Sequence, residues 1–172
     1  MKVGVIGAES SGKSTLCREL EMHYGYKWIK EYAREYVEQL SRPYTEADLD
    51  CISQKLIEQI SATYDEKVVL YDTELIVMKV WYAHVYGRVP EAIEEALRTY
   101  PMDYYLLLAP DLPAEPDPVR ENLDRRDYFF AWYEREIQAT GVPYTIIHGT
   151  GDTRIQVAAE AIRLLQQQIK QS

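Results

Sequence analysis

A glycine-rich loop near the N-terminus is the strongest constraint on the fold of this chain. Residues 7–14 read GAESSGKS, which satisfies the pattern G-x-x-x-x-G-K-[ST]. The loop directly follows Lys2–Ile6, an apolar run typical of a strand buried on both faces. It directly precedes Lys13–Tyr24, whose apolar residues recur at helical spacing. A strand, this loop and a helix in succession predict an α/β protein built on a parallel sheet.

The loop has the chemistry needed to hold a nucleoside triphosphate. Its glycines allow backbone N–H groups to turn inward around phosphate oxygens. Lys13 adds a positive charge directed at the β- and γ-phosphates, and the Ser14 hydroxyl can ligate Mg²⁺. A chance match in a chain with only 8 glycines is a rare event. We therefore expect ATP and Mg²⁺, with the nucleotide held by Gly7, Glu9, Ser10, Ser11, Gly12, Lys13, Ser14 and Thr15.

Strands and helices alternate along the rest of the chain. Four further strands are expected at Tyr26–Ile29, Val68–Tyr71, Tyr104–Ala109 and Tyr144–Ile147. Helices are expected at Glu31–Leu40, from Thr45 past Ile60, and at Thr73–His84, Glu91–Thr99, Leu123–Ala139 and Arg154–Ile169. This alternation predicts a three-layer P-loop fold, in which a five-stranded parallel sheet carries helices on both faces. All 172 residues are expected to form one domain.

The charge balance bears on the partners of the chain. It has 28 acidic and 19 basic residues, a formal charge of −9, so nucleic acid and anionic membranes are unfavourable partners. No stretch approaches the ~20 apolar residues of a membrane span. Cys17 and Cys51 show no metal-ligand spacing, and both are expected to be buried on helices without forming a disulfide framework. A cytoplasmic protein with a small-molecule partner follows, and its oligomeric state stays open.

A carboxylate follows the third expected strand. Val68–Tyr71 is apolar or aromatic throughout and leads directly into Asp72. At the carboxyl end of a parallel strand, Asp72 would face the same crevice as the phosphate loop. There it can hold Mg²⁺, directly or through water, or accept a proton from a substrate. Apolar runs that end in Asp are common, so the interpretation depends on the phosphate loop.

A proline-rich segment followed by arginines helps to decide which class of P-loop protein the chain belongs to. The chain lacks the N-K-x-D element of GTP switches and is short for a mechanical ATPase. Residues 110–126 instead resemble the lid of a small-molecule or nucleotide kinase, which excludes water during transfer. Arginines in a lid can contact the charge that develops in phosphoryl transfer. The candidates are Arg120, Arg125 and Arg126, of which the last two can equally be explained by pairing with Asp124 and Asp127.

Six short motifs in the right order resemble a known family. They are GAESSGKST (7–15), EYAREY (31–36), YDTE (71–74), YPMD (100–103), DPVR (117–120) and GVPY (141–144). Together they resemble the ribosylnicotinamide kinase domain of NadR-type proteins. The resemblance implies a nucleoside-kinase-like fold and ATP-dependent phosphorylation of the 5′-hydroxyl of nicotinamide riboside. Larger members also carry an adenylyltransferase domain with an H-x-G-H motif, which is absent here, so the chain looks like the kinase domain alone.

The resemblance also assigns roles at the second expected strand. Related nucleoside kinases place a carboxylate near the acceptor hydroxyl, and Glu31 occupies that position. It can orient the hydroxyl and accept its proton, or it can be an acidic helix N-cap, with Asp72 as the competing base. Arg34 can pair with Glu31, reach the transferred phosphate or form a surface ion pair. Larger members stack an aromatic residue on the nicotinamide where this chain has Lys30, and Trp28, on the same strand face, is the expected substitute.

Two further groups of residues are expected near the ligands. Tyr86 aligns with an aromatic family position that can cover the base, whereas Trp81 and Tyr82 are expected in the core. After the fifth strand, Thr150 and Gly151 are expected to border the adenine, in a loop that also caps the last helix. The predicted function is therefore a nucleoside kinase. Alternatives are a kinase of another small metabolite and a regulatory ATP-binding protein with slow ATPase activity.

Overall fold

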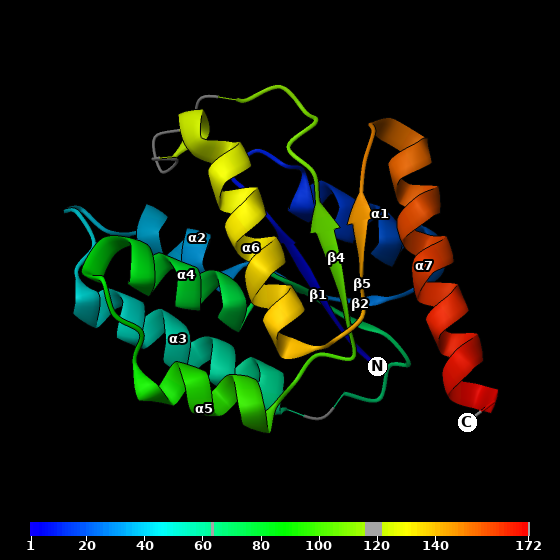
Figure 1. The fold of residues 1–172 in the computed structure, drawn as a ribbon, viewed down its shortest axis with the longest axis horizontal. Coiled ribbons are helices and arrows are strands. Elements are labelled where there is room, and N and C mark those ends of the chain that lie inside the picture. Colours follow the sequence, from blue (N-terminus) through cyan, green and yellow to red (C-terminus); the bar gives the residue numbers. More distant parts are fainter. Residues whose placement is uncertain (63, 116–121, 172) are drawn as a thin grey trace.

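The computed structural model describes residues 1–62, 64–115 and 122–171, and it contains the expected parallel sheet. The five strands form one sheet in the order β2-β3-β1-β4-β5, and every neighbouring pair is parallel. Figure 1 shows β1, β4 and β5 side by side. Their bounds are Lys2–Gly7 (β1), Lys27–Ile29 (β2), Val69–Asp72 (β3), Tyr104–Leu108 (β4) and Tyr144–Ile147 (β5). The expected fold class is confirmed.

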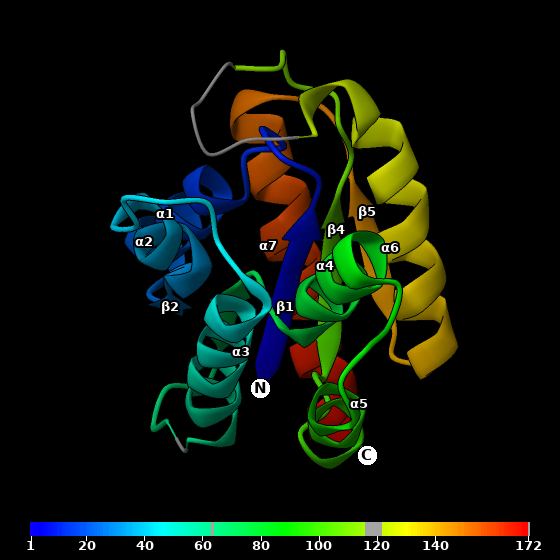
Figure 2. The same ribbon diagram turned by 90° about the vertical axis from the view of Figure 1, so that its left-hand side faces the viewer.

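Helices cover both faces of the sheet. Figure 1 shows β1, β4 and β5 between α4 and α6 on one side and α1 and α7 on the other, and in Figure 2 α4 lies in front of the strands and α7 behind them. The helices are α1 (Lys13–Tyr24), α2 (Tyr32–Glu38), α3 (Glu46–Ser61), α4 (Leu75–Tyr86), α5 (Glu91–Thr99), α6 (Arg126–Thr140) and α7 (Gly151–Gln171), with a 3-10 turn at Leu123–Arg125. None of these helices, within the described residues, is long and apolar enough to cross a membrane.

Alternation along the strands creates two separate apolar cores. Successive side chains of a strand point to opposite faces of the sheet. In β4, Tyr105 and Leu107 pack into the core beneath α3–α6, whereas Leu106 and Leu108 pack into the core beneath α1 and α7. Each side chain is at most 1% exposed. Because both faces are covered, the central strands read as continuous apolar runs, and the sequence identifies them clearly.

The sheet brings the phosphate loop and the β3 carboxylate to the same edge. β1 lies between β3 and β4, and its Val5 is opposite Asp72 in the register with β3. The loop that leaves β1 at Gly7 therefore emerges beside Asp72. In a doubly wound sheet, ligands bind at this carboxyl edge, where the chain leaves a central strand toward both sides.

Several expected boundaries are wrong, with local reasons. α4 begins at Leu75 and not at Thr73, because Thr73 has φ 71° and the Glu74 side chain caps the helix by accepting a hydrogen bond from Ile76 N at 2.8 Å. The last helix begins at Gly151, three residues before the expected Arg154. Both cysteines are free, but only Cys17 is buried; Cys51 is exposed, which corrects that expectation.

Gly4 makes room for an aromatic side chain in the core above β1. A Cβ atom at Gly4 would lie 2.6 Å from Cδ1 of Tyr105 and 3.2 Å from Cγ of Glu74. We predict that Gly4→Ala lowers the free energy of unfolding by about 1–3 kcal/mol, the usual range for overpacking. Urea denaturation of the wild type and the variant measures this loss. In a Tyr105→Leu background the same substitution should cost clearly less, and an equal cost in both backgrounds would contradict the steric explanation.

Candidate active site

The phosphate loop has the strained turn geometry that its sequence predicts. A Cβ atom at Gly7 would lie 2.5 Å from Ser11 Oγ and 3.0 Å from the carbonyl oxygen of Leu108. Gly12 has φ +80° and Ser10 has φ 58°, both in the left-handed region. α1 begins immediately afterwards, so the positive end of its dipole faces the loop. The loop is therefore shaped for an anion at the N-terminus of α1.

Lys13 lies between this loop and two carboxylates. Its Nζ donates hydrogen bonds to the carbonyl oxygens of Gly7 at 3.0 Å and Ala8 at 3.3 Å. The same ammonium group lowers the pKa of both Glu31 and Asp72, against the stronger effect of burial. The Lys13 ammonium group therefore interacts with the carbonyl oxygens of the loop and with the carboxylates of Glu31 and Asp72.

Asp72 is a buried carboxylate in need of a partner. It is 1% exposed, and neither of its carboxylate oxygens accepts a hydrogen bond. Burial raises the pKa of Asp72 above its usual value, and the Lys13 charge, the Ser14 hydroxyl and the Trp28 indole oppose that shift. A buried carboxylate whose oxygens accept no well-formed hydrogen bond is costly unless a cation completes its environment.

The side chain of Glu31 faces the cavity and does not cap a helix. Glu31 occupies the N-cap position of α2, yet its side chain makes no capping hydrogen bond. Burial raises its pKa most strongly, the Lys13 charge lowers it, Asp72 raises it, and the Thr73 hydroxyl and the Arg34 charge lower it. The structure therefore brings Lys13, Glu31 and Asp72 together, as the sequence leads us to expect.

The donor atoms around Asp72 suit Mg²⁺. The two hydrogen-bond-free oxygens of Asp72 lie beside the Ser14 hydroxyl, and oxygen ligands are those that Mg²⁺ prefers. Across the described residues, no group of three or more His, Cys, Asp or Glu side chains is placed to hold a metal. Magnesium would therefore depend on nucleotide phosphates and water for its remaining ligands, as is usual in P-loop sites.

A cavity of about 730 Å³ opens from the phosphate loop over the α3–α6 face of the sheet. Glu31 and Arg34 line it together with residues 7–15. This volume is within the usual range for a small-molecule site. Its far wall consists of aromatic side chains from α4, α6 and the segment before α3, namely Tyr44, Trp81, His84, Phe129 and Tyr133.

The aromatic wall is held by contacts among its own members. Trp81 Nε1 donates a hydrogen bond to Tyr44 Oη at 3.1 Å, and the two rings meet edge to face with centroids 5.1 Å apart. The ring of His84 meets that of Phe129 edge to face at 5.0 Å. The wall therefore presents rigid ring surfaces to the cavity, which suit a planar base.

Most of this wall was not identified from the sequence. Trp81 was expected only in the core, and it does pack against that core while also lining the cavity. Tyr82 is fully buried, as expected. The spacing of Trp81 from Val77, and of Tyr133 from Phe129, four residues in each case, places each pair on one helix face. The same spacing is typical of helix residues that pack into a hydrophobic core, so the sequence alone does not distinguish a cavity wall from a core.

Two residues expected to bind the base, Trp28 and Tyr86, do not line this cavity, and their roles stay predictions. Trp28 packs into the core beneath α1 and α7, and Lys30 Nζ lies 5.3 Å from its ring centroid on that same face. The cavity lies over the opposite face of the sheet, and the indole of Trp28 instead points toward Asp72. Tyr86 packs beside Tyr82, with ring centroids 6.1 Å apart, and does not line the cavity.

The expected arginines have separate environments. Arg34 lines the cavity and pairs with Glu38 through an Nε–Oε1 distance of 2.7 Å. Arg125 lies over the ring of Tyr128, with its Cζ 4.5 Å from the centroid, whereas Arg126 donates from Nη2 to the carbonyl oxygen of Leu112 at 2.8 Å. Neither Arg125 nor Arg126 lines the cavity. Arg120 lies outside the described residues.

Two side chains of the phosphate loop reach the segment that was expected to be a lid. Glu9 accepts a hydrogen bond from Asn122 N at 2.9 Å, and Ser10 Oγ accepts one from Glu115 N at 2.9 Å. Glu115 and Asn122, the described residues that precede and follow residues 116–121, therefore both contact the phosphate loop directly. Thr150 and Gly151, by contrast, are exposed and lie outside the cavity at the start of α7.

The segment before α3 is held by a buried aspartate. Asp48, 3% exposed, accepts two hydrogen bonds from Arg42, at 2.7 and 3.0 Å, and one from Tyr36 Oη at 3.0 Å. It also accepts hydrogen bonds from the backbone N and the hydroxyl of Thr45, each at 2.7 Å. These donors hold the pKa of Asp48 far below its usual value. The network fixes the chain on either side of Tyr44 and so supports the aromatic wall.

The fold and the phosphate loop define a P-loop protein. Residues 2–154 match the family model AAA_28, described as an AAA domain, and the chain belongs to this family.

The expected NadR-type resemblance is confirmed in sequence. The chain is 25% identical over 135 residues to "Trifunctional NAD biosynthesis/regulator protein NadR" from Escherichia coli (strain K12), which covers 73% of this chain and 33% of the relative. The protein of the same name from Salmonella typhimurium gives the same figures. The chain thus spans about a third of the length of these curated relatives.

Solved structures show the same fold. A NadR protein in complex with NR superposes with a TM-score of 0.75 at 22% identity, over 95% of this chain and 50% of the other. A deoxyadenosine kinase from M. mycoides gives a TM-score of 0.69 at 14% identity, over 95% of this chain and 99% of the other. A P-loop fold shared with nucleoside kinases therefore follows.

We predict that the stability of the protein depends on Asp48 in a pH-dependent way. Because its folded-state pKa is depressed, its ionised form stabilises the fold above the unfolded pKa of about 4, and this contribution is lost as the pH falls toward the folded value. Asp48→Asn should therefore reduce the free energy of unfolding at pH 7 and flatten its decline in acid, as measured by urea denaturation at several pH values. Asp65→Asn, on an exposed loop, is the control. A difference from wild type that stays constant down to pH 2 would refute the proposed charge effect.

Proposed function

We propose that this chain is an ATP- and Mg²⁺-dependent kinase that phosphorylates the 5′-hydroxyl of a nucleoside, and that nicotinamide riboside is its acceptor. The observation that carries the proposal is the placement of Glu31. Its carboxylate is free of a helix-capping bond and lines the same cavity as Lys13 and the phosphate loop. The likeness to NadR supports the choice of acceptor.

The residues of the cavity can divide the work between donor and acceptor. Residues 7–15 hold the triphosphate through backbone N–H groups, and Lys13 moves from the Gly7 and Ala8 carbonyls to phosphate oxygens. Glu31 orients the acceptor hydroxyl and accepts its proton late in transfer, a role favoured by its raised pKa. Magnesium held by Ser14 and Asp72 supplies charge neutralisation at the phosphates.

The aromatic wall provides the surface for the acceptor base. Trp81 and Tyr44 are locked edge to face, so a planar base can stack without ordering a flexible side chain first. Both lie on the same side of the sheet as Glu31, where Trp28 is absent. The same wall accommodates other bases, and another nucleoside is the second candidate acceptor. Contacts of Arg120, Arg125 and Arg126 with phosphate, contacts of Thr150 and Gly151 with adenine, and a cytoplasmic location all stay predictions.

A panel of nucleosides tests the function directly. The purified chain is incubated with Mg-ATP and each nucleoside, and ADP and the 5′-phosphorylated product are quantified separately. We expect phosphorylation of nicotinamide riboside above all other members of the panel. Product from a different nucleoside alone would replace the acceptor but keep the kinase. ADP release without any phosphorylated nucleoside would instead indicate a regulatory ATP-binding protein.

Removal of the phosphate-loop cation should abolish turnover. We predict that Lys13→Ala lowers kcat by two orders of magnitude or more, because the charge that neutralises the transferred group is lost, about 3 kcal/mol of transition-state stabilisation. A thermal melt should show a folded protein. Lys55→Ala, on the exposed side of α3, is the matched control and should keep wild-type turnover. Unchanged turnover of Lys13→Ala at saturating Mg-ATP would contradict the assignment of the loop.

The two carboxylates should have separable effects. We predict that Asp72→Asn raises the Mg²⁺ concentration needed for half-maximal activity, whereas Glu31→Gln lowers kcat and leaves ATP affinity intact. Both amides keep the shape of the side chain and remove its charge. Steady-state kinetics across a Mg²⁺ titration measures both effects, with Glu35→Gln on the exposed part of α2 as control. Full kcat in Glu31→Gln, together with inactive Asp72→Asn at every Mg²⁺ concentration, would reverse the two roles.

A further inference from the structure

The indole of Trp28 lies beside Asp72 on the α1 face of the sheet. Trp28 is the middle residue of β2 and is opposite Leu70 in the register with β3. Successive side chains of a strand alternate between the two faces, so Leu70 and Asp72, two residues apart, share one face. Trp28 and Leu70 both pack into the core beneath α1 and α7. Asp72 is therefore a diagonal neighbour of Trp28 on that face, within reach of a long aromatic side chain.

Three polar atoms are buried at this place without a well-formed hydrogen bond to any described residue. They are Nε1 of Trp28 and the two carboxylate oxygens of Asp72. An indole N–H is a donor only and an ionised carboxylate is an acceptor only, so the two groups are complementary. Burial raises the pKa of Asp72, and the Trp28 indole is one of the groups that oppose this shift. A buried donor thus faces buried acceptors.

Helix α1 supplies the other neighbours of the Asp72 carboxylate. The Lys13 charge and the Ser14 hydroxyl also oppose the effect of burial on the pKa of Asp72. Cys17, three residues further along α1, is fully buried, and its burial, followed by the Asp72 charge, raises the pKa of its thiol. A thiol is only a weak donor. The carboxylate therefore has strong donors from two elements, Lys13 and Ser14 from α1 and Trp28 from β2.

The position of the Trp28 side chain is fixed by contacts on several sides. The backbone N of Trp28 donates a hydrogen bond to Glu21 Oε1 of α1 at 3.3 Å. Lys30 Nζ lies 5.3 Å from the centroid of the indole ring, within the range of a cation–π contact. The ring itself packs against the core beneath α1 and α7. The indole therefore has little freedom to turn its N–H away from Asp72.

Packing alone gives a poor account of an indole at this position. A buried N–H without a hydrogen bond is costly, and a phenylalanine ring would fill much of the same space without that cost. Carboxylates that ligate metals are commonly oriented by hydrogen bonds from side chains that do not touch the metal themselves. An N–H donor beside Asp72 has the chemistry for this task.

We propose that Trp28 is a positioning residue for Asp72, whose indole N–H holds one carboxylate oxygen and leaves the other turned toward Ser14. The inference rests on the proposed use of Asp72 and Ser14 for Mg²⁺. Trp28 acts through Asp72 and does not touch the nucleotide or the acceptor.

The test measures what Mg²⁺ adds to nucleotide binding, so it needs no phosphoryl transfer. Isothermal titration calorimetry of the full chain, without any nucleoside, gives Kd for the ATP analogue AMP-PNP in excess Mg²⁺ and in EDTA. Trp28→Phe removes the N–H and keeps an aromatic ring. We expect it to weaken binding in Mg²⁺ about 10-fold and to change Kd in EDTA by less than about 2-fold. Trp132→Phe removes the indole N–H that is donated to Glu136, and as the matched control it should change neither value.

The outcomes separate this inference from the proposed function. Equal weakening by Trp28→Phe in Mg²⁺ and in EDTA, or no weakening in either, would overturn the inference and leave the kinase intact. A wild type that binds AMP-PNP equally well with and without Mg²⁺ would overturn it too, because Asp72 would then hold no metal. Absence of AMP-PNP binding by the wild type would refute the proposed function first. A nucleoside panel without product has no bearing on these values.

Asp72→Asn shows whether Trp28 acts through Asp72. In the Asp72→Asn background, Trp28→Phe should have no further effect on Kd in Mg²⁺, because the carboxylate that it positions is already lost. A second 10-fold loss, of about the same size as in the wild type, would place the action of Trp28 elsewhere and overturn the inference.

A spectroscopic measurement leaves Trp28 unchanged and so does not depend on the folding of Trp28→Phe. The chain has three tryptophans, and Trp81→Phe and Trp132→Phe assign the indole N–H signal of Trp28 by elimination in a nitrogen–proton NMR spectrum. We expect the indole proton of Trp28 to move upfield in Asp72→Asn, because an amide oxygen accepts a weaker hydrogen bond than a carboxylate. The signals of Trp81 and Trp132 should stay in place. An unchanged Trp28 signal would overturn the inference.

Discussion

The charge of Lys13 is the interaction on which this site depends. Two carboxylates lie at the carboxyl edge of the sheet, the buried Asp72 and the half-buried Glu31, and burial raises the pKa of both. The Lys13 ammonium opposes that shift at each of them while it also binds the carbonyl oxygens of the phosphate loop. Without a cation at this point, the negative charges of the two carboxylates would repel each other and raise the pKa of both further.

Two groups of side chains border the phosphate loop at the carboxyl edge. Rings from α4, α6 and the segment before α3 contribute to a cavity of about 730 Å³. Arg154 ties the loops after β4 and β5 to each other close to Gly12, which lines the same cavity. β1 lies centrally in the sheet, so the loop that leaves it is bordered by both groups.

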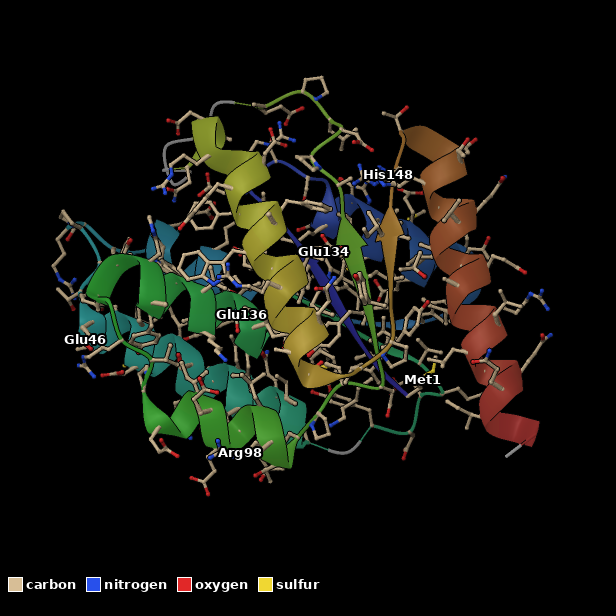
Figure 3. All side chains as sticks on the ribbon, viewed as in Figure 1. Met1, Glu46, Arg98, Glu134, Glu136 and His148 are labelled. Atoms are coloured by element: carbon tan, nitrogen blue, oxygen red, sulfur yellow. The ribbon has the colours of Figure 1, made fainter. Side chains whose placement is uncertain are left out.

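The helices on the aromatic side are joined by charged groups as well as by the core. Lys79 of α4 pairs with Glu94 of α5 and Glu136 of α6, each at 3.1 Å, and Glu136 is labelled on α6 in Figure 3. Tyr82 of α4 donates a hydrogen bond to Asp50 of α3. Because several charges share these contacts, the helices that carry the wall of the cavity are held at fixed separations.

The sequence by itself determined the sheet, the phosphate loop and the acids at the ends of two strands. These features are local: an apolar run, the glycines of residues 7–14 and a carboxylate directly after a strand are read without knowledge of distant contacts. Only the tertiary structure decided which side of the sheet the cavity occupies. Trp28, which alternates to the α1 face, lies outside the lining of that cavity, and Tyr44, Trp81 and Phe129 line it from three separate segments. The sequence did not single out Arg154 for the same reason. Its partners are backbone carbonyl oxygens up to 45 residues away, and every residue has a carbonyl, so no sequence pattern identifies them.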